Sequence, residues 1–307
     1  MARDSTHILD AATLKRIRVA PGTKVRLKDH DSAWTFHSQL KGGSDEEIKK
    51  QAKKILKDDL ARLSLAQQLL FASCSHSLLI ILQAMDAGGK DGTIKHVMSG
   101  VNPQGCRVTS FKQPSQEELE HDFLWRQEKA LPARGQIGIF NRSHYEEVLV
   151  TKVHPDLLKK EGLSTHSLHK KFWRQRYQDI NSFERHLARN GTVVLKFFLH
   201  ISKKTQKERF LERLEDPRKH WKFSLQDLAE RKHWKEYVAA YEETLSLTST
   251  LTAPWYIIPA DHKWSARVLV TEVIEAAINA LDLKYPKPNR QQARELKEAK
   301  EALQAEK

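Results

Sequence analysis

The chain has 307 residues, enough to bury the core of one large domain or of two small ones. Its 52 lysines and arginines exceed its 39 acidic residues, and the net charge of +13 favours polyanionic partners such as nucleic acid, an anionic membrane surface or a chain of phosphates. No apolar run reaches the ~20 residues of a membrane span, and residues 1–10 lack the apolar core of a signal peptide, so we expect a soluble cytoplasmic protein. Cys74 and Cys106 lack metal-ligand spacing, and we expect both to be reduced thiols.

The N-terminal half begins with a predicted irregular arm over residues 1–44, where proline and glycine pairs interrupt the pattern. A helix is predicted at Asp45–Ala72, because Ser44 is a suitable N-cap and acidic residues fill the first turn. Apolar runs and one further helical pattern then predict, in order, a strand at Ser77–Met85, a short strand at Arg107–Phe111, a helix at Glu117–Ala130 and a strand at Gln136–Phe140.

The C-terminal half alternates helices and strands in the same way. Its predicted helical stretches are Leu157–Asn190 with a break at Gly162, Thr205–Leu251 with a break at Pro217, and Ala266–Leu281. Its predicted strands are Thr192–Ile201 and Trp255–Pro259. Residues 284–307 are rich in Lys, Glu, Ala and Gln, and we expect a charged, solvated helical or frayed tail there.

Short apolar strands separated by helical stretches predict an α/β fold with a mostly parallel, five-stranded sheet and helices on both faces. Ligands of such sheets bind beyond the carboxyl ends of the strands. We therefore expect the turn after the first strand, the stretch Asn141–Tyr145 and the region Ile201–Lys204 to meet at one edge.

A strand, a glycine-rich turn and a helix start follow one another in I-I-L-Q-A-M-D-A-G-G-K-D-G, from Ile80 to Gly92. Backbone N–H groups of such a turn can face an anion, and a lysine among them completes a phosphate cradle. The Walker A pattern is imperfect here, because Ala84 replaces its first glycine and Asp91 replaces its Ser or Thr. An ordinary strand-to-helix turn with a solvated lysine is the alternative.

Two acidic side chains flank this turn. Asp86 lies at the strand end and suits Mg²⁺, which prefers carboxylate and phosphate oxygens, and Asp91 is a second candidate ligand. Simpler interpretations stay open: Asp86 as a cap of the following helix, and Asp91 as a surface charge.

Two other stretches carry candidate chemistry. In F-N-R-S-H-Y after a buried strand, Arg142 offers a planar fork suited to phosphate. The segment Lys203–Tyr237 is rich in lysine and arginine, with Arg209 and Arg213 on one helix face, and could form a lid over phosphates. Its glutamates could instead pair with these cations on an ordinary solvated face.

Four motifs in order resemble the family 2 polyphosphate kinases: A-M-D-A-G-G-K-D-G-T-I-K, I-F-N-R-S-H-Y-E, D-P-R-K-H-W-K-F-S and A-P-W-Y-I-I-P-A-D. The resemblance spans roughly Val25–Leu281 and implies a P-loop kinase-like three-layer sandwich over residues 45–283, with a helical lid near 203–238. It further implies reversible, Mg²⁺-dependent transfer of phosphoryl groups from inorganic polyphosphate to AMP and ADP, giving ADP and ATP, with Mn²⁺ as a substitute ion. A homodimer or homotetramer without nucleic-acid or membrane partners is expected.

The resemblance also implies roles for single residues. Asp86 would bind the metal and handle the acceptor phosphate, while Lys90 and Arg142 would stabilise the charge in transfer. The phosphate-binding and polyphosphate-binding residues it implies are Gly88, Gly89, Gly92, Thr93, Lys95, Arg209, Arg213, Lys222 and Arg231.

Asn141, which completes the implied catalytic set, stands where many family members have aspartate. The asparagine form resembles the branch that accepts nucleoside monophosphates as well as diphosphates. Because a nucleotide phosphate is already anionic, loss of a general base need not stop the transfer, which depends on positioning and charge neutralisation.

Two further functions are compatible with the residues. One is a nucleotide kinase that uses ATP as donor, and the other is a nucleic-acid-binding protein with a vestigial P-loop. The basic lid favours a polyphosphate donor, and no helix-turn-helix, zinc or aromatic RNA-binding motif is evident in the sequence.

Overall fold

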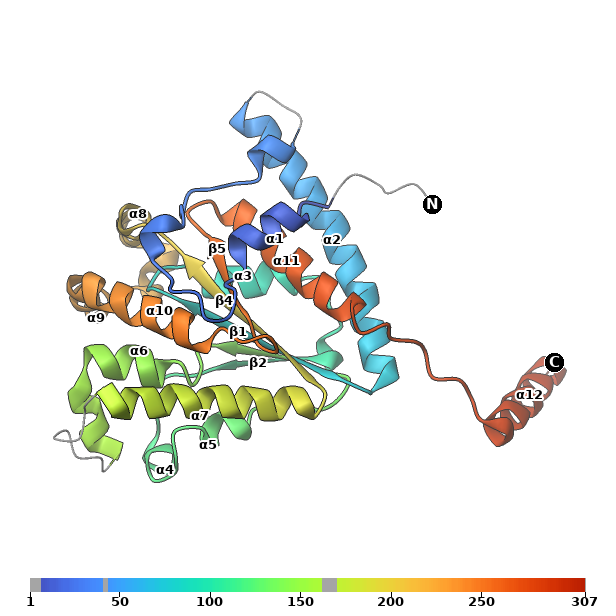
Figure 1. Cartoon of the computed structure of the whole chain (residues 1–307). Coiled ribbons are helices and arrows are strands. Elements are labelled where there is room, and N and C mark those ends of the chain that lie inside the picture. The colour runs from blue at the N-terminus through green and yellow to red at the C-terminus, as the bar shows by residue number, and fades with distance from the viewer. Residues whose placement is uncertain (1–6, 41–43, 162–169, 307) are drawn as a thin grey trace.

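The computed structural model describes residues 7–40, 44–161 and 170–306, so the predicted break at Gly162 lies outside the described residues. Five parallel strands form one sheet in the order β2-β3-β1-β4-β5 (Figure 1). The strands are β1 (Ser77–Ala84), β2 (Cys106–Ser110), β3 (Ile137–Asn141), β4 (Thr192–His200) and β5 (Trp255–Pro259). The parallel five-stranded sheet is confirmed, and each strand ends within one residue of its predicted bounds.

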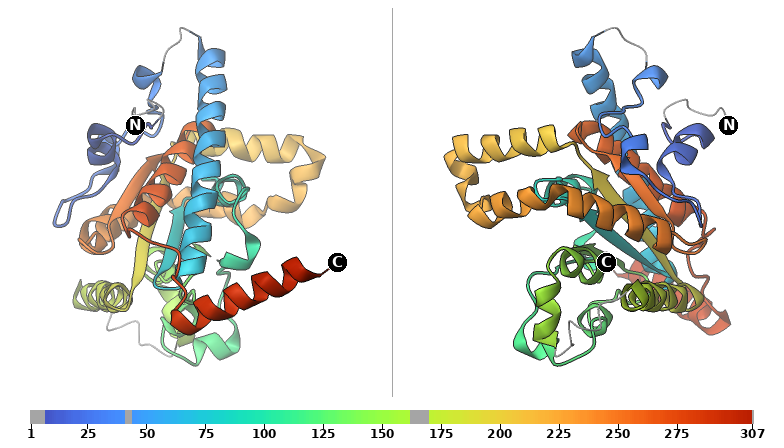
Figure 2. Two further views of the ribbon diagram at one scale, coloured as in Figure 1. Left: turned by 90° about the vertical axis from the view of Figure 1, so that its right-hand side faces the viewer. Right: turned by 60° about the vertical axis from the view of Figure 1, so that its left-hand side comes forward.

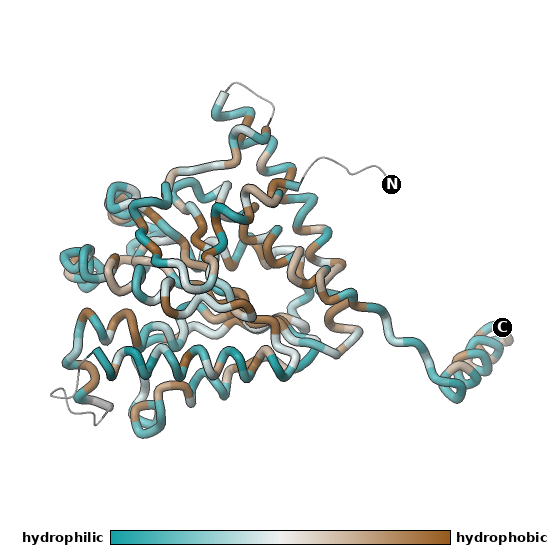
Figure 3. Tube along the Cα trace, viewed as in Figure 1, coloured by the Kyte–Doolittle hydropathy of each residue, from teal (hydrophilic) through white to brown (hydrophobic). Residues whose placement is uncertain are grey.

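Strand β1 lies at the centre of the sheet, and all of its residues are buried. It pairs with β3 on one side, where Leu78 faces Ile137, and with β4 on the other, where Ser77 faces Thr192. A continuous apolar run is what a strand covered on both faces requires, and Figure 3 shows the apolar residues gathered along these central strands. The first apolar run of the sequence therefore forms the middle of the core.

Helices cover both faces of the sheet, as predicted (Figure 1). One layer contains α2 (Asp45–Ser73), α3 (Lys90–Val97) and α11 (Lys263–Asn279), and the other contains α6 (Glu146–Val153), α7 (Lys170–Arg189) and α10 (Trp234–Thr248). The start of α2 is a capping box in which Ser44 and Glu47 each bond the other's backbone N–H, so the predicted N-cap is confirmed. The short helix α6 was not predicted, because its few apolar residues follow the turn after β3 without a long periodic pattern.

The predicted single helix Glu117–Ala130 is wrong. Two short helices stand there, α4 (Gln116–Leu119) and α5 (Trp125–Glu128). Between them the Asp122 carboxylate accepts a hydrogen bond from the Leu124 N–H, an aspartate turn that competes with helix continuation.

The N-terminal arm is not merely irregular, since it contains α1 (Ala11–Ile17) and two 3-10 turns, Leu27–Asp29 and His37–Gln39. Arg18 forms a bridge with Tyr256 of β5, and the Val19 N–H donates to the Trp255 carbonyl at 2.9 Å. The arm thus covers the free edge of β5, which would otherwise expose unpaired backbone groups. Ile17 is buried in the same core as the sheet, so this part of the arm belongs to the folded body.

The region predicted as a lid leaves the carboxyl edge of the sheet (Figure 2). It comprises α8 (Lys203–Glu215), the 3-10 turn Pro217–Lys222, α9 (Leu225–Glu230), the 3-10 turn Arg231–His233 and the start of α10. The break at Pro217 is confirmed. Two further 3-10 turns of the chain are Pro103–Gly105 and Pro155–Glu161.

The C-terminal tail forms α12 (Arg290–Ala305), which is exposed along its length and stands away from the sheet (Figure 1). This agrees with the predicted solvated helical tail. Among the described helices, none is both long and apolar enough to cross a bilayer.

Candidate active site

The turn between β1 and α3 has the backbone of an anion cradle. Gly89 has φ +98°, a left-handed conformation that favours glycine, and Ala87 has φ +58°. A Cβ on Gly88 would lie 2.4 Å from the Ala84 Cβ and 2.8 Å from the Met85 carbonyl oxygen, so no side chain fits there. Helix α3 begins directly afterwards, and the unpaired N–H groups of its first turn suit an anion. The predicted strand, glycine turn and helix are confirmed.

The other predicted residues of this segment lie on α3. A Cβ on Gly92 would meet Arg267 at an ordinary 3.9 Å, so space does not demand glycine there. Thr93 is buried beneath the turn, and Lys95 is exposed.

Lys90 is half-buried at the carboxyl end of β1, and its ammonium group donates to the Ala84 carbonyl at 3.1 Å. Burial lowers the pKa of Lys90, and the Arg142 guanidinium acts in the same direction, whereas Asp86 and Glu146 oppose them. A cation held beside the cradle in this way can neutralise phosphate oxygens.

Arg142 follows β3 with φ +64°, and its backbone N–H donates to the Leu82 carbonyl at 3.2 Å. Such a left-handed conformation costs a non-glycine residue about 1 kcal/mol or more. The guanidinium lies 3.4 Å from an Asp86 carboxylate oxygen and 3.8 Å from one of Glu146. Glu146 raises the pKa of Arg142 most, burial opposes it, and Asp86 adds to the rise. The structure therefore brings Asp86, Lys90 and Arg142 together at the predicted edge.

Asn141 joins the end of β3 to the first turn of α3. Its amide donates to the Asp91 carboxylate at 2.7 Å and to the Ser110 hydroxyl at 3.4 Å. Sequence reasoning treated Asn141 and Asp91 separately and missed this contact, for which no local pattern gives a signal. The contact ties Asp91 to the carboxyl end of β3.

Helix α8 holds the glycine turn from the lid side. The Arg209 guanidinium is buried and donates to the carbonyls of Ala87 at 3.0 Å, Ala260 at 2.5 Å and Asp261 at 3.1 Å. Gln206, which sequence reasoning missed, donates to the Asp86 carbonyl at 2.9 Å. In this arrangement Arg209 ties the turn to the loop after β5, and its contact with phosphate stays a prediction.

The remaining predicted cations are spread over the lid. Arg231 donates to the Lys203 carbonyl at 2.9 Å and to the Gln206 side chain at 2.7 Å. Arg213 pairs with Asp227 at 3.5 Å, and the exposed Lys222 lies 4.8 Å from the centre of the Trp221 ring. Of these, Arg231 lines the cavity between the strand edge and the lid, while Arg213 and Lys222 do not.

A cavity of about 680 Å³ separates the strand edge from the lid. Its lining includes Asp86, Arg142 and Glu146 on one side and Asp227, Glu230, Arg231, Trp234 and Tyr237 on the other. Phe111 and Arg126 also line the cavity, with the Arg126 guanidinium carbon 5.4 Å from the centre of the Phe111 ring. An apolar, aromatic wall with a few convergent charges is typical of a pocket for an organic anion. The aromatic side of this pocket was not predicted.

The topology explains why these groups meet. From the neighbouring strands β1 and β3 the chain continues into α3 on one face of the sheet and α6 on the other, which opens a crevice at the carboxyl edge. A glycine cradle with a lysine, a facing arginine and a flanking carboxylate in that crevice define an α/β phosphotransferase of the P-loop kinase type.

Comparisons with known proteins agree with this class. The model of the family Polyphosphate kinase 2 matches residues 44–286. The ADP-polyphosphate phosphotransferase of Rhodopseudomonas palustris is 48% identical over 290 residues, which cover 94% of this chain and 98% of that protein. The AMP/ADP-polyphosphate phosphotransferase of Meiothermus ruber is 44% identical over 275 residues, which cover 90% of this chain and 96% of that protein.

A solved structure is similar along almost the same length. The crystal structure of Polyphosphate Kinase 2 from Arthrobacter aurescens TC1 has a TM-score of 0.82 and 39% identity, covering 93% of this chain and 95% of that one. The chain therefore belongs to the polyphosphate kinase 2 family, and the P-loop kinase-like fold is confirmed. Phosphotransferases of this kind generally need a divalent metal ion.

Proposed function

We propose that the chain transfers phosphoryl groups reversibly between inorganic polyphosphate and the nucleotides AMP and ADP, giving ADP and ATP. The observation that carries this proposal is the Asp86–Arg142 pair beside the glycine cradle, opening into the cavity beneath the basic lid. The names of the relatives from R. palustris and M. ruber support both acceptors.

Each group at the edge has a part in this reaction. The N–H groups at the start of α3 and the Lys90 ammonium hold the phosphoryl group that is transferred, and the Arg142 guanidinium neutralises the charge that it carries in the transition state. Arg213, Lys222 and Arg231 of the lid hold the polyphosphate chain by electrostatic attraction. The acceptor nucleotide lies in the cavity, with its phosphate toward Asp86.

The aromatic wall gives the acceptor a place for its base. Phe111, Trp234 and Tyr237 line the cavity, and a flat base can stack on such rings. The Tyr237 hydroxyl is already held by the Glu230 carboxylate at 2.8 Å, and His154 lies 2.7 Å from the same carboxylate. The hydrogen bond to Glu230 holds the Tyr237 ring in place as one wall of the base pocket.

The acidic side chains at the edge fit Mg²⁺. Asp86 lines the cavity, and Asp91 accepts a hydrogen bond from Asn141 at the end of β3. Carboxylate oxygens combined with phosphate oxygens are the ligands that Mg²⁺ prefers. We assign Asp86 as the main ligand, with Mn²⁺ as a substitute ion. When bound, the ion neutralises charge on the phosphate oxygens.

The test is an incubation of the purified chain with Mg²⁺ and long-chain polyphosphate, with AMP or ADP in separate tubes, followed by ion-exchange separation of the nucleotides. We expect ATP from ADP, and ADP and then ATP from AMP. ATP from ADP alone would refute AMP as an acceptor. No product in either tube, with product when ATP replaces polyphosphate as donor, would identify an ATP-dependent nucleotide kinase instead.

We also propose that the enzyme works in the cytoplasm as a homodimer or homotetramer, as the family resemblance implies. Sedimentation equilibrium of the purified chain measures the assembly directly. A mass of a single 35.5 kDa chain at micromolar concentration would exclude both assemblies.

A further inference from the structure

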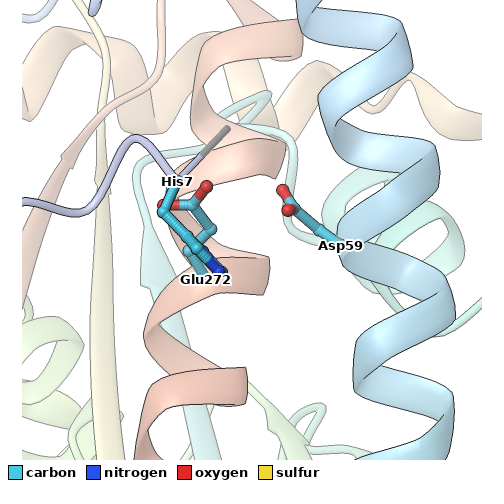
Figure 4. Close-up of side chains that lie close together, drawn as sticks. All are labelled: His7, Asp59 and Glu272. Atoms are coloured by element: carbon cyan, nitrogen blue, oxygen red, sulfur yellow. The ribbon is translucent and has the colours of Figure 1, made fainter. Parts of the chain in front are cut away.

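Three metal-ligating side chains meet where the N-terminal segment crosses helices α2 and α11, away from the glycine turn. They are His7, Asp59 of α2 and Glu272 of α11, and their donor atoms lie within 4.8 Å of one another (Figure 4). None of the three lines the cavity of the candidate active site. The cluster therefore has no role in the proposed polyphosphate reaction.

The two carboxylates of the cluster are almost completely buried, with 0% of Asp59 and 2% of Glu272 exposed. Both oxygens of Glu272 accept backbone N–H groups of the arm, from Ile8 at 2.9 Å and from Leu9 at 2.5 Å. One oxygen of Asp59 pairs with Arg62. The other, Oδ2, has no hydrogen-bond partner although it is buried, and Figure 4 shows this carboxylate turned toward Glu272.

The charges around Asp59 do not balance. Arg62 also pairs with Glu275 at 3.0 Å, so one guanidinium serves two carboxylates. Among the described residues Glu272 has no lysine or arginine within ion-pair distance, which leaves three carboxylates against one cation. Burial of uncompensated carboxylates is strongly unfavourable. A divalent cation would supply two positive charges to these carboxylates.

We propose that His7, Asp59 and Glu272 bind a divalent transition-metal ion such as Zn²⁺, which fastens the N-terminal segment to the α2–α11 pair. A donor set of one imidazole and two carboxylates favours a divalent transition-metal ion over Mg²⁺. Donor atoms of Zn²⁺ lie about 2.0–2.2 Å from the ion, so the cluster must contract on binding. His7 is exposed, and its side chain can supply this movement.

A proton shared between the carboxyl groups of Asp59 and Glu272 is the competing explanation for this buried cluster. Burial and the neighbouring Glu272 raise the pKa of Asp59 to about 8, and a proton on Oδ2 would also satisfy the orphaned oxygen. Proton and metal ion are mutually exclusive occupants of that oxygen, so a binding experiment separates them.

The experiment uses the full-length chain without an affinity tag, stripped with EDTA and returned to buffer with excess Mg²⁺ to fill the phosphoryl-transfer site. Zn²⁺ is titrated by calorimetry, and Co²⁺ is titrated with visible absorption as the readout. The variants are Asp59→Asn, which preserves shape, and His7→Ala, at an exposed position. Asp58→Asn, which removes the neighbouring carboxylate on α2, is the matched control.

We expect one tight site in the parent chain and in Asp58→Asn, with Zn²⁺ affinity more than about tenfold weaker in the other two variants. The visible Co²⁺ bands should weaken in the same two variants. Binding that is unchanged in Asp59→Asn and His7→Ala would place the ion elsewhere and overturn the proposal. Absence of Zn²⁺ and Co²⁺ binding in the parent chain would also overturn it, in favour of the shared proton.

Discussion

Replacement of the buried Lys196 by methionine should destabilise the protein strongly. The Lys196 side chain is fully buried on β4, and its ammonium group donates to a Glu184 oxygen at 2.6 Å, the Tyr145 hydroxyl at 2.9 Å and the Thr248 carbonyl at 2.6 Å. These contacts join the central sheet to α7, to the segment before α6 and to the end of α10. All three ammonium hydrogens are used, which indicates a charged lysine beside an ionised glutamate.

The magnitude follows from what Lys196→Met leaves behind. Glu184 is only 1% exposed and would keep the Tyr145 hydroxyl, at 2.7 Å, as its main donor. Breaking a buried ion pair by removing one partner costs about 3–5 kcal/mol, because the other charge stays buried without compensation. That is a large part of the ~5–15 kcal/mol that stabilises a typical domain. The double variant Lys196→Met/Glu184→Gln removes both charges, and it should recover more than half of the loss.

The pH dependence gives a second, independent readout. Burial by itself would raise the pKa of Glu184, but Lys196 and then His144 outweigh it and hold this pKa below its ordinary value of 4.5. In the parent chain the contribution of Glu184 is therefore complete above about pH 4.5 and is lost as the pH falls through the lower folded-state pKa. Without Lys196 the folded-state pKa of Glu184 rises above 4.5. The free-energy cost of burying the ionised Glu184 carboxylate then grows as the pH rises above 4.5.

The assay is urea unfolding followed by tryptophan fluorescence, at pH 5 and pH 8. We expect the free energy of unfolding of Lys196→Met to lie about 3–5 kcal/mol below that of the parent at pH 8, with a smaller gap at pH 5. A difference below about 1 kcal/mol at pH 8, or a gap that widens at pH 5, would refute the assignment of a charged, mutually dependent pair.

Four further predictions concern the active site. Lys90→Ala and Asp86→Ala should each lower turnover by about a hundredfold or more without changing the thermal unfolding midpoint, and near-normal turnover in either variant would remove that residue from the mechanism. Gly88→Ala should also abolish most activity, because its Cβ would lie 2.4 Å from that of Ala84 and distort the cradle; a fully active variant would show that the turn adapts. Asn141→Asp places a carboxylate where the amide now donates to Asp91 at 2.7 Å, so like-charge repulsion should shift the ratio of AMP to ADP use, and identical ratios would detach this residue from acceptor choice. Polyphosphate affinity, measured by titration at several salt concentrations, should fall steeply with added salt, and a flat response would contradict electrostatic binding by the lid.

The sequence by itself determined the local elements and their order. The strand at the centre of the sheet was predicted from one unbroken apolar run, and the cradle from glycines around Lys90. Both signals are local, because a strand covered on two faces needs consecutive apolar residues and a tight turn needs residues without a Cβ. The meeting of Asp86 and Arg142 was also predictable, since carboxyl ends of parallel strands share one edge.

Only the tertiary structure decided how distant residues pair. Arg209 looked like a phosphate-binding cation of the lid, yet its guanidinium is engaged by three backbone carbonyls around the glycine turn. The bond from Asn141 to Asp91 and the cluster of His7, Asp59 and Glu272 each join segments far apart in the chain. Periodicity and spacing record which face of an element is buried, but they carry no record of which element packs against that face. Long-range pairing follows from the packing of the whole domain, and it is there that charge balance and side-chain direction are settled.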